Sequence, residues 1–235
     1  MRDYAALYRE SRGRIAALVR EASDEQRARL VPGCPKWTVS DTVAHLAAVA
    51  VDALAGYSVP TISADEHTAV QVEQRRGRPL EEVLGEWDIA AGRIEQALAA
   101  QRMSPLLVHD VLTHEADIRG ALGAGRPPET AWSMCLKMAS STVLSDRLGH
   151  LGRLTIIAGD HRFTAGTGEP ATTLDVDPYE LWRSLLGRRS RAQMAAWKWS
   201  GDPEPYVQAM PVLVPPKCPF PNLRAGKRSG SASGA

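Results

Sequence analysis

The sequence has few cysteines, and their spacing is irregular. Its three cysteines, Cys34, Cys135 and Cys218, are odd in number and form no CxxC pair. Small secreted scaffolds depend on paired cysteines, whereas cytoplasmic proteins keep their thiols reduced. The pattern therefore argues against a disulfide scaffold and predicts a cytoplasmic protein.

The sequence also lacks a surplus of charge, a long apolar run and an apolar N-terminal segment. It has 28 Lys and Arg against 27 Asp and Glu, so its formal net charge is +1. A general nucleic-acid binder carries a surplus of clustered basic residues, and a membrane-spanning helix needs about 18 or more apolar residues in a row. Residues 1–4 are already polar and open no signal peptide. We therefore expect neither nucleic acid nor a membrane among the partners.

The first 150 residues have a helical pattern. Apolar residues recur at steps of three and four, which is typical of one helix face. Such stripes occur over residues 3–22, 39–56, 79–98, 104–122 and 129–149. Thr38 and Asp41 form a capping-box pattern at the start of the second stripe, with Asp in place of the usual Glu. The polar residues 57–78 predict a long loop or a short irregular helix.

The pattern changes near residues 149–152, after which β-branched residues gather. Strands are expected at residues 154–158, 161–164, 172–176 and 197–200, with a turn at Gly159–Asp160 and a helix that begins at Asp177–Pro178. We expect a mainly α fold: an up-and-down helix bundle in residues 1–150 and a small α+β domain in residues 151–212. The Pro-, Gly- and Ser-rich residues 213–235 are expected to be a disordered tail.

Two residues of the 104–122 helix are candidate metal ligands. Asp110 and His114 are four residues apart, so they lie one turn apart on the same helix face. His45, in the middle of the second helix, is the natural third ligand, and three protein ligands leave an open position on a divalent metal. The alternatives are a weak ion pair on a solvated helix face for Asp110 and His114, and a hydrogen-bonded core histidine for His45.

Two segments resemble a known family in their motifs. Residues 34–46, CPKWTVSDTVAHL, resemble the CPxWTVxDxxxHL segment of the DinB-like, mycothiol-dependent maleylpyruvate isomerase family. Residues 109–119 resemble the second metal segment of that family. Residues 186–190 and 199–203 resemble its C-terminal domain, which is similar to sterol-carrier-type α+β domains. The resemblance follows the family's order over about residues 1–210.

The resemblance implies a DinB-like four-helix bundle that holds a divalent metal, usually Zn²⁺, through His45, Asp110 and His114. Founding members tend to have Glu where this chain has Asp110, so ligand reach or metal preference can differ. Asp117 would orient a ligand imidazole or bind an Arg, and a plain salt bridge to a neighbouring Arg remains an alternative. Cys34 has no adjacent base and is expected to be structural, and Trp37 is expected to lie in the core or to wall the pocket.

The resemblance also implies a thiol mechanism with mycothiol as cofactor. The activated thiolate would add to a cis double bond conjugated to a carbonyl, the new single bond would rotate, and elimination would return the trans alkene. Arg189 is the candidate cation for a substrate carboxylate, because Arg offers bidentate contacts. The alternative for this Arg is a solvated helix end.

The predicted function is therefore the isomerisation of a conjugated cis-alkene acid, with a small-molecule substrate and a low-molecular-weight thiol as partners. Three alternatives remain open: a mycothiol S-transferase, a thiol-independent metalloenzyme of specialised metabolism, and a non-enzymatic carrier of small molecules or lipids.

Overall fold

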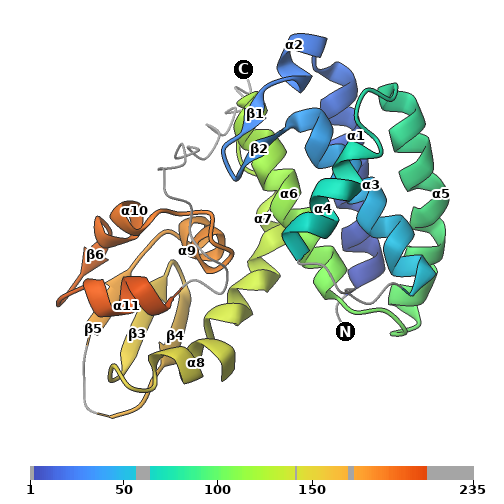
Figure 1. Cartoon of the computed structure of the whole chain (residues 1–235). Coiled ribbons are helices and arrows are strands. Elements are labelled where there is room, and N and C mark those ends of the chain that lie inside the picture. Colours follow the sequence, from blue (N-terminus) through green and yellow to red (C-terminus); the bar gives the residue numbers. More distant parts are fainter. Residues whose placement is uncertain (1–2, 57–63, 141, 169–171, 211–235) are drawn as a thin grey trace, which may run out of the picture. The chain divides into compact units, whose positions relative to one another are not determined.

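The computed structural model describes residues 3–56, 64–140, 142–168 and 172–210 (Figure 1). Within them the chain divides into two compact units. The described residues of the first unit are 3–56, 64–105 and 114–127, and those of the second are 106–113, 128–140, 142–168 and 172–210. One continuous helix, α6, contributes residues to both units.

The first unit is built on long helices, which confirms the expected bundle. Its elements are α1 (Tyr4–Glu21), α2 (Asp24–Arg27), β1 (Leu30–Val31), β2 (Cys34–Thr38), α3 (Val39–Ala55), α4 (Ala64–Glu73), α5 (Leu80–Ala99) and the C-terminal part of α6 (Leu106–Leu122). Helix α5 packs against both α1 and α3. Their large core side chains include Tyr8 and Trp87, and the Trp87 Nε1–H donates a hydrogen bond to the Tyr8 hydroxyl over 2.8 Å.

The predicted capping box fixes the start of α3. The Thr38 hydroxyl accepts a hydrogen bond from the Asp41 backbone N–H over 3.0 Å, and the Asp41 carboxylate accepts one from the Thr38 backbone N–H over 2.9 Å. At the other end Gly56 adopts a φ of 69°, a left-handed conformation that favours glycine. Both ends of the helix that carries His45 are therefore set by local sequence.

A short hairpin, which the sequence pattern did not predict, precedes α3. Strands β1 and β2 pair in antiparallel fashion, with Val31 opposite Cys34, so the turn falls at Pro32 and Gly33. The pattern had predicted only a chain break at these prolines and glycine. Because a two-residue strand carries no visible alternation, it leaves no signal of period two.

The second unit contains a small mixed sheet, which confirms the expected α+β part. Its strands are β3 (Leu154–Ala158), β4 (His161–Ala165), β5 (Thr172–Asp175) and β6 (Lys198–Trp199), in the order β4-β3-β5-β6. Strand β3 is antiparallel to β4 and parallel to β5, and β5 is antiparallel to β6. The expected turn at Gly159 has a φ of 57°. Helices α9 (Pro178–Leu185) and α10 (Arg191–Ala195) lie between β5 and β6 in the chain, and α11 (Glu204–Ala209) follows β6.

The prediction of one continuous helix over residues 129–149 was wrong. The structure has α7 (Glu129–Trp132), a 3₁₀ helix (Ser133–Ser140) and α8 (Thr142–Leu148) in its place. Side chains recur at steps of three in a 3₁₀ helix as well as in part of an α-helical stripe, so the apolar pattern does not distinguish them.

Residues 128–150 group with the second unit, whereas the sequence pattern placed them with the first. The predicted boundary at residue 150 stays a prediction. The predicted tail, residues 213–235, lies outside the described residues. No helix within the described part of the chain is long and apolar enough to cross a membrane.

Candidate metal centre

The structure brings the three predicted metal ligands together. His45 lies in the middle of α3, and Asp110 and His114 lie one turn apart on the continuous helix α6. Each offers one ligand atom, and these atoms lie within 4.8 Å of one another. The two imidazoles are buried, Asp110 is half-buried, and the ring centroids of His45 and His114 are 5.2 Å apart. Since helix continuity fixes Asp110 relative to His114, and His45 packs against His114 within the first unit, the three form one cluster.

A buried glutamine orients the His45 ring. Gln71 Oε1 lies 3.2 Å from His45 Nδ1, and Gln71 Nε2 donates a hydrogen bond to Asp52 Oδ2 over 2.6 Å. A carboxylate accepts hydrogen bonds, so Asp52 fixes the amide with its oxygen toward His45. That oxygen can only accept, which assigns the proton of His45 to Nδ1. Nε2 of His45 is then the nitrogen suited to a metal.

An aspartate lies beside the His114 ring. Asp117 Oδ2 is 3.2 Å from His114 Nδ1, one turn along the same helix, and both side chains are buried. A carboxylate beside the second ring nitrogen is a common neighbour of an imidazole that binds a metal. Asp117 therefore lies where the sequence-based interpretation expected a residue that orients a ligand imidazole.

Two residues of the hairpin contribute more to the site than the sequence suggested. The Trp37 ring lies 4.8 Å from the His45 ring and 6.2 Å from the His114 ring, measured between centroids, so it covers both imidazoles. Cys34, Asp117 and His114 form a second, overlapping set of potential ligands, again with atoms within 4.8 Å of one another. Sequence reasoning expected Cys34 to be structural, but its sulfur lies beside the candidate centre.

The sequence analysis missed a buried carboxylate next to His114. The Glu115 side chain is fully buried and accepts hydrogen bonds from Ser11 Oγ at 2.7 Å, from Arg14 Nε and Nη2 at 2.8 Å each, and from Arg119 Nε at 3.0 Å. The hydrogen bond to Glu115 raises the pKa of Arg14 above its ordinary value. Because Ser11 and Arg14 belong to α1, this ion cluster fixes α6 against α1 beside a candidate ligand. Ser11 within the apolar stripe of α1 was the available signal.

The donor set suits a divalent metal such as zinc. Zinc takes imidazole nitrogen and carboxylate oxygen at about 2.0–2.2 Å, and ligand atoms on one ion are then about 3–4 Å apart. The ligand atoms of the cluster lie within 4.8 Å of one another, which is near that range. Two imidazoles and one carboxylate leave a fourth position for an exogenous ligand, which is the pattern of a catalytic site.

The other predicted catalytic residue lies in the second unit. Arg189 is buried, with Nε and Nη2 hydrogen-bonded to the Glu180 carboxylate and Nη1 donating to the Arg188 carbonyl over 2.6 Å. The alternative of a solvated helix end is therefore wrong for Arg189. Its predicted role toward a substrate carboxylate stays a prediction. The same unit holds a second buried arginine, Arg183, which donates to the Thr113 carbonyl of α6 over 3.0 Å.

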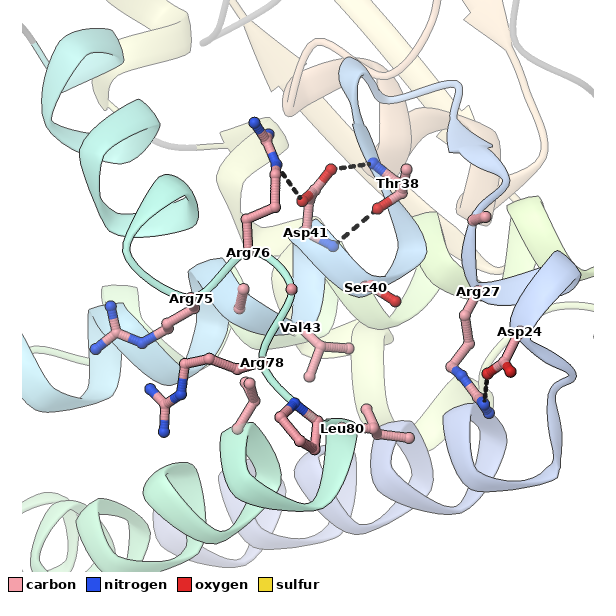
Figure 2. A pocket seen from close by; sticks show the side chains of 15 residues that line it. Asp24, Arg27, Thr38, Ser40, Asp41, Val43, Arg75, Arg76, Arg78 and Leu80 are labelled. Atoms are coloured by element: carbon pink, nitrogen blue, oxygen red, sulfur yellow. Dashed lines mark hydrogen bonds and ion pairs between the residues drawn. The ribbon is translucent and has the colours of Figure 1, made fainter.

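A separate cavity of about 450 Å³ lies at the N-terminal end of α3 (Figure 2). Figure 2 shows the Thr38–Asp41 capping box at its edge, with Arg76 Nε hydrogen-bonded to Asp41 over 3.4 Å. Arg75 and Arg78, also in its lining, both pair with Glu86. The lining includes none of the three candidate metal ligands, and its arginines are engaged by neighbouring carboxylates.

Fold and site together define a class: a helix bundle in which two helices bring a histidine and an aspartate–histidine pair together as a set that could hold one divalent metal. A family model described as the mycothiol maleylpyruvate isomerase N-terminal domain matches residues 8–148, more than half of the chain, and the chain belongs to this family. No curated protein matches the sequence.

Two solved structures share the fold. One is the mycothiol-dependent maleylpyruvate isomerase, with 17% identity and a TM-score of 0.59. The other is a histidine-to-alanine mutant of a mycothiol-dependent maleylpyruvate isomerase, with 16% identity and a TM-score of 0.58. Each comparison covers 91% of this chain and 95% of that chain. At this identity the similarity establishes the fold alone.

Proposed function

We propose that the protein is a divalent-metal-dependent enzyme that uses mycothiol to isomerise a conjugated cis-alkene acid to its trans form. The observation that carries the proposal is the cluster of His45, Asp110 and His114, whose ligand atoms lie within 4.8 Å of one another, in a chain of the mycothiol maleylpyruvate isomerase family. A dication bound there would lower the pKa of a thiol at its open position, which supplies a thiolate near neutral pH.

The residues around the cluster hold the two imidazoles in productive orientations. Gln71, fixed by Asp52, keeps the proton of His45 on Nδ1, and Asp117 lies against Nδ1 of His114. Under this proposal, Nε2 of each imidazole is the nitrogen that would bind the metal. Trp37 lies against both rings, and an apolar wall of this kind would strengthen electrostatic interactions at the site.

Arg189 is the proposed cation for the substrate carboxylate. Its ion pair with Glu180 and its hydrogen bond to the Arg188 carbonyl hold the guanidinium in one orientation. A cation held in advance loses little entropy on binding a carboxylate. Under this proposal Arg189→Lys, which loses the bidentate geometry, raises KM for a carboxylate substrate and leaves metal content unchanged.

The test combines metal content with thiol dependence. The full chain, purified without chelators, is expected to bind about one divalent ion per molecule, and His45→Ala and His114→Ala are expected to lose it. His161→Ala, an exposed histidine on β4, is the matched control and should keep the ion. Isomerisation of maleylpyruvate should require added mycothiol.

Two outcomes would contradict the proposal. Full metal content in His45→Ala and His114→Ala would mean that this cluster does not bind the ion. Isomerisation at the same rate without mycothiol would remove the thiol from the reaction. A stable thioether between mycothiol and the substrate as the final product would instead identify an S-transferase.

A further inference from the structure

The turn of the β1–β2 hairpin comes unusually close to Asp117, the residue beside His114. A Cβ atom built on Gly33 would lie 2.6 Å from Asp117 Oδ1, 2.9 Å from Asp117 Cγ and 3.1 Å from Asp117 Oδ2. Contacts of a Cβ atom under 3.0 Å essentially never occur in proteins. The absence of a side chain at Gly33 therefore makes room for this carboxylate.

The backbone conformation gives no other reason for glycine at this position. Gly33 is not among the glycines with positive φ in the described part of the chain. An alanine there would therefore not carry the strain of a left-handed backbone conformation. The three nearest atoms that a methyl group would meet all belong to the Asp117 carboxylate.

Neither partner of this contact has freedom to move away. In β1, before the turn, Val31 is fully buried. In β2, after the turn, Trp37 packs against His45. The hairpin is therefore held at both strands. On α6 the Asp117 side chain is fully buried, short, and 3.2 Å from His114 Nδ1. A displaced Asp117 carboxylate would therefore change the surroundings of the His114 ring.

We propose that Gly33 is a positioning residue for the metal centre, which acts on His114 through Asp117. The inference rests on the proposed function, because it assigns His114 as a ligand. It reaches beyond that function by making the hairpin turn, far from α6 in sequence, a determinant of metal affinity. Loss of a partner that orients a ligand typically weakens metal binding about 10–100-fold, and Gly33→Ala is expected to fall in that range.

The experiment measures Zn²⁺ affinity of the metal-free full chain by competition with a chromophoric chelator. Gly33→Ala is compared with Gly13→Ala, a glycine of α1 whose added Cβ would meet nothing within 4 Å. Gly33→Ala should weaken Zn²⁺ binding, and Gly13→Ala should bind Zn²⁺ as the unchanged chain does. Thermal unfolding of the metal-free forms shows whether each variant is folded.

A double-mutant cycle separates positioning from a general structural effect. In the Asp117→Ala background the carboxylate is gone, so Gly33→Ala should cause no further loss of Zn²⁺ affinity. If Gly33→Ala alone does not fold, the double variant should fold, because the clash is removed. A double variant that remains unfolded, or an equal affinity loss in both backgrounds, would overturn the proposal.

The remaining outcomes separate this inference from the proposed function. If the unchanged chain binds Zn²⁺ and Gly33→Ala binds it equally well, the role of Gly33 is wrong and the proposed function stands. If the unchanged chain binds no divalent metal at all, both fall together.

Discussion

Replacing Glu115 by Gln tests whether the buried ion cluster holds α6 against α1. Glu115 is fully buried and accepts hydrogen bonds from Ser11, Arg14 and Arg119. Removing one partner of a buried ion pair costs about 3–5 kcal/mol, because the other charge stays buried and unpaired. Glutamine keeps one acceptor oxygen, and the Arg14 side chain is 23% exposed, so water relieves part of this cost.

We therefore expect Glu115→Gln to lower the free energy of unfolding by about 2–3 kcal/mol. For a chain of this size, that loss corresponds to a fall of about 4–12 °C in Tm. The assay is thermal and urea unfolding of the metal-free chain, followed by far-ultraviolet circular dichroism.

The matched control is Glu95→Gln, which breaks another ion pair to α1. Glu95 contacts Arg9 at 3.0 Å, and the Arg9 side chain is 56% exposed. An exposed pair of this kind contributes about 0.2–1 kcal/mol. A loss of stability in Glu115→Gln no larger than that of Glu95→Gln would refute the reasoning.

Two further predictions concern the first unit. Gln71→Leu removes the oxygen that faces His45 Nδ1, so we expect Zn²⁺ affinity to fall about 10–100-fold. The chelator competition assay measures this affinity. An unchanged affinity would mean that Gln71 does not orient His45. The second prediction concerns stability in acid. Burial alone would raise the pKa of Glu86, but the hydrogen bonds and charges of Arg75 and Arg78 outweigh the effect of burial. They hold the pKa of Glu86 below its ordinary value of 4.5. A carboxyl group with a lowered folded-state pKa stabilises the fold above its unfolded pKa, and this contribution is lost as the pH falls through the folded pKa. Melting temperatures measured from neutral to acid pH should therefore fall more steeply for the unchanged chain than for Glu86→Gln, and parallel curves would contradict this.

Local sequence was sufficient for the parts of the site that depend on one helix. The four-residue step from Asp110 to His114 determines that they share a face, whatever the surrounding fold. The capping box at Thr38 and Asp41 likewise marks the start of α3 from four residues alone. These features could be predicted because helix geometry decides them.

The contacts between distant segments could not be predicted in this way. The burial of Glu115 depends on Ser11 and Arg14, about a hundred positions earlier in the chain, and no spacing rule connects them. The positions of Cys34 and Trp37 beside the imidazoles depend on a hairpin too short to leave an alternating pattern. The partner of Arg189 is Glu180, and the turn after α9 that brings them together is not visible in the residue pattern.

X-ray absorption spectroscopy at the zinc edge of the zinc-loaded full chain tests the central claim most directly. The proposed centre predicts only nitrogen and oxygen scatterers from the protein, at about 2.0–2.2 Å, with imidazole outer-shell features from two histidines. A sulfur scatterer at about 2.3 Å in the absence of added thiol would contradict it, because Cys34 would then be a ligand. The metal would in that case be held by Cys34, Asp117 and His114, and His45 and Asp110 would lose their assigned role.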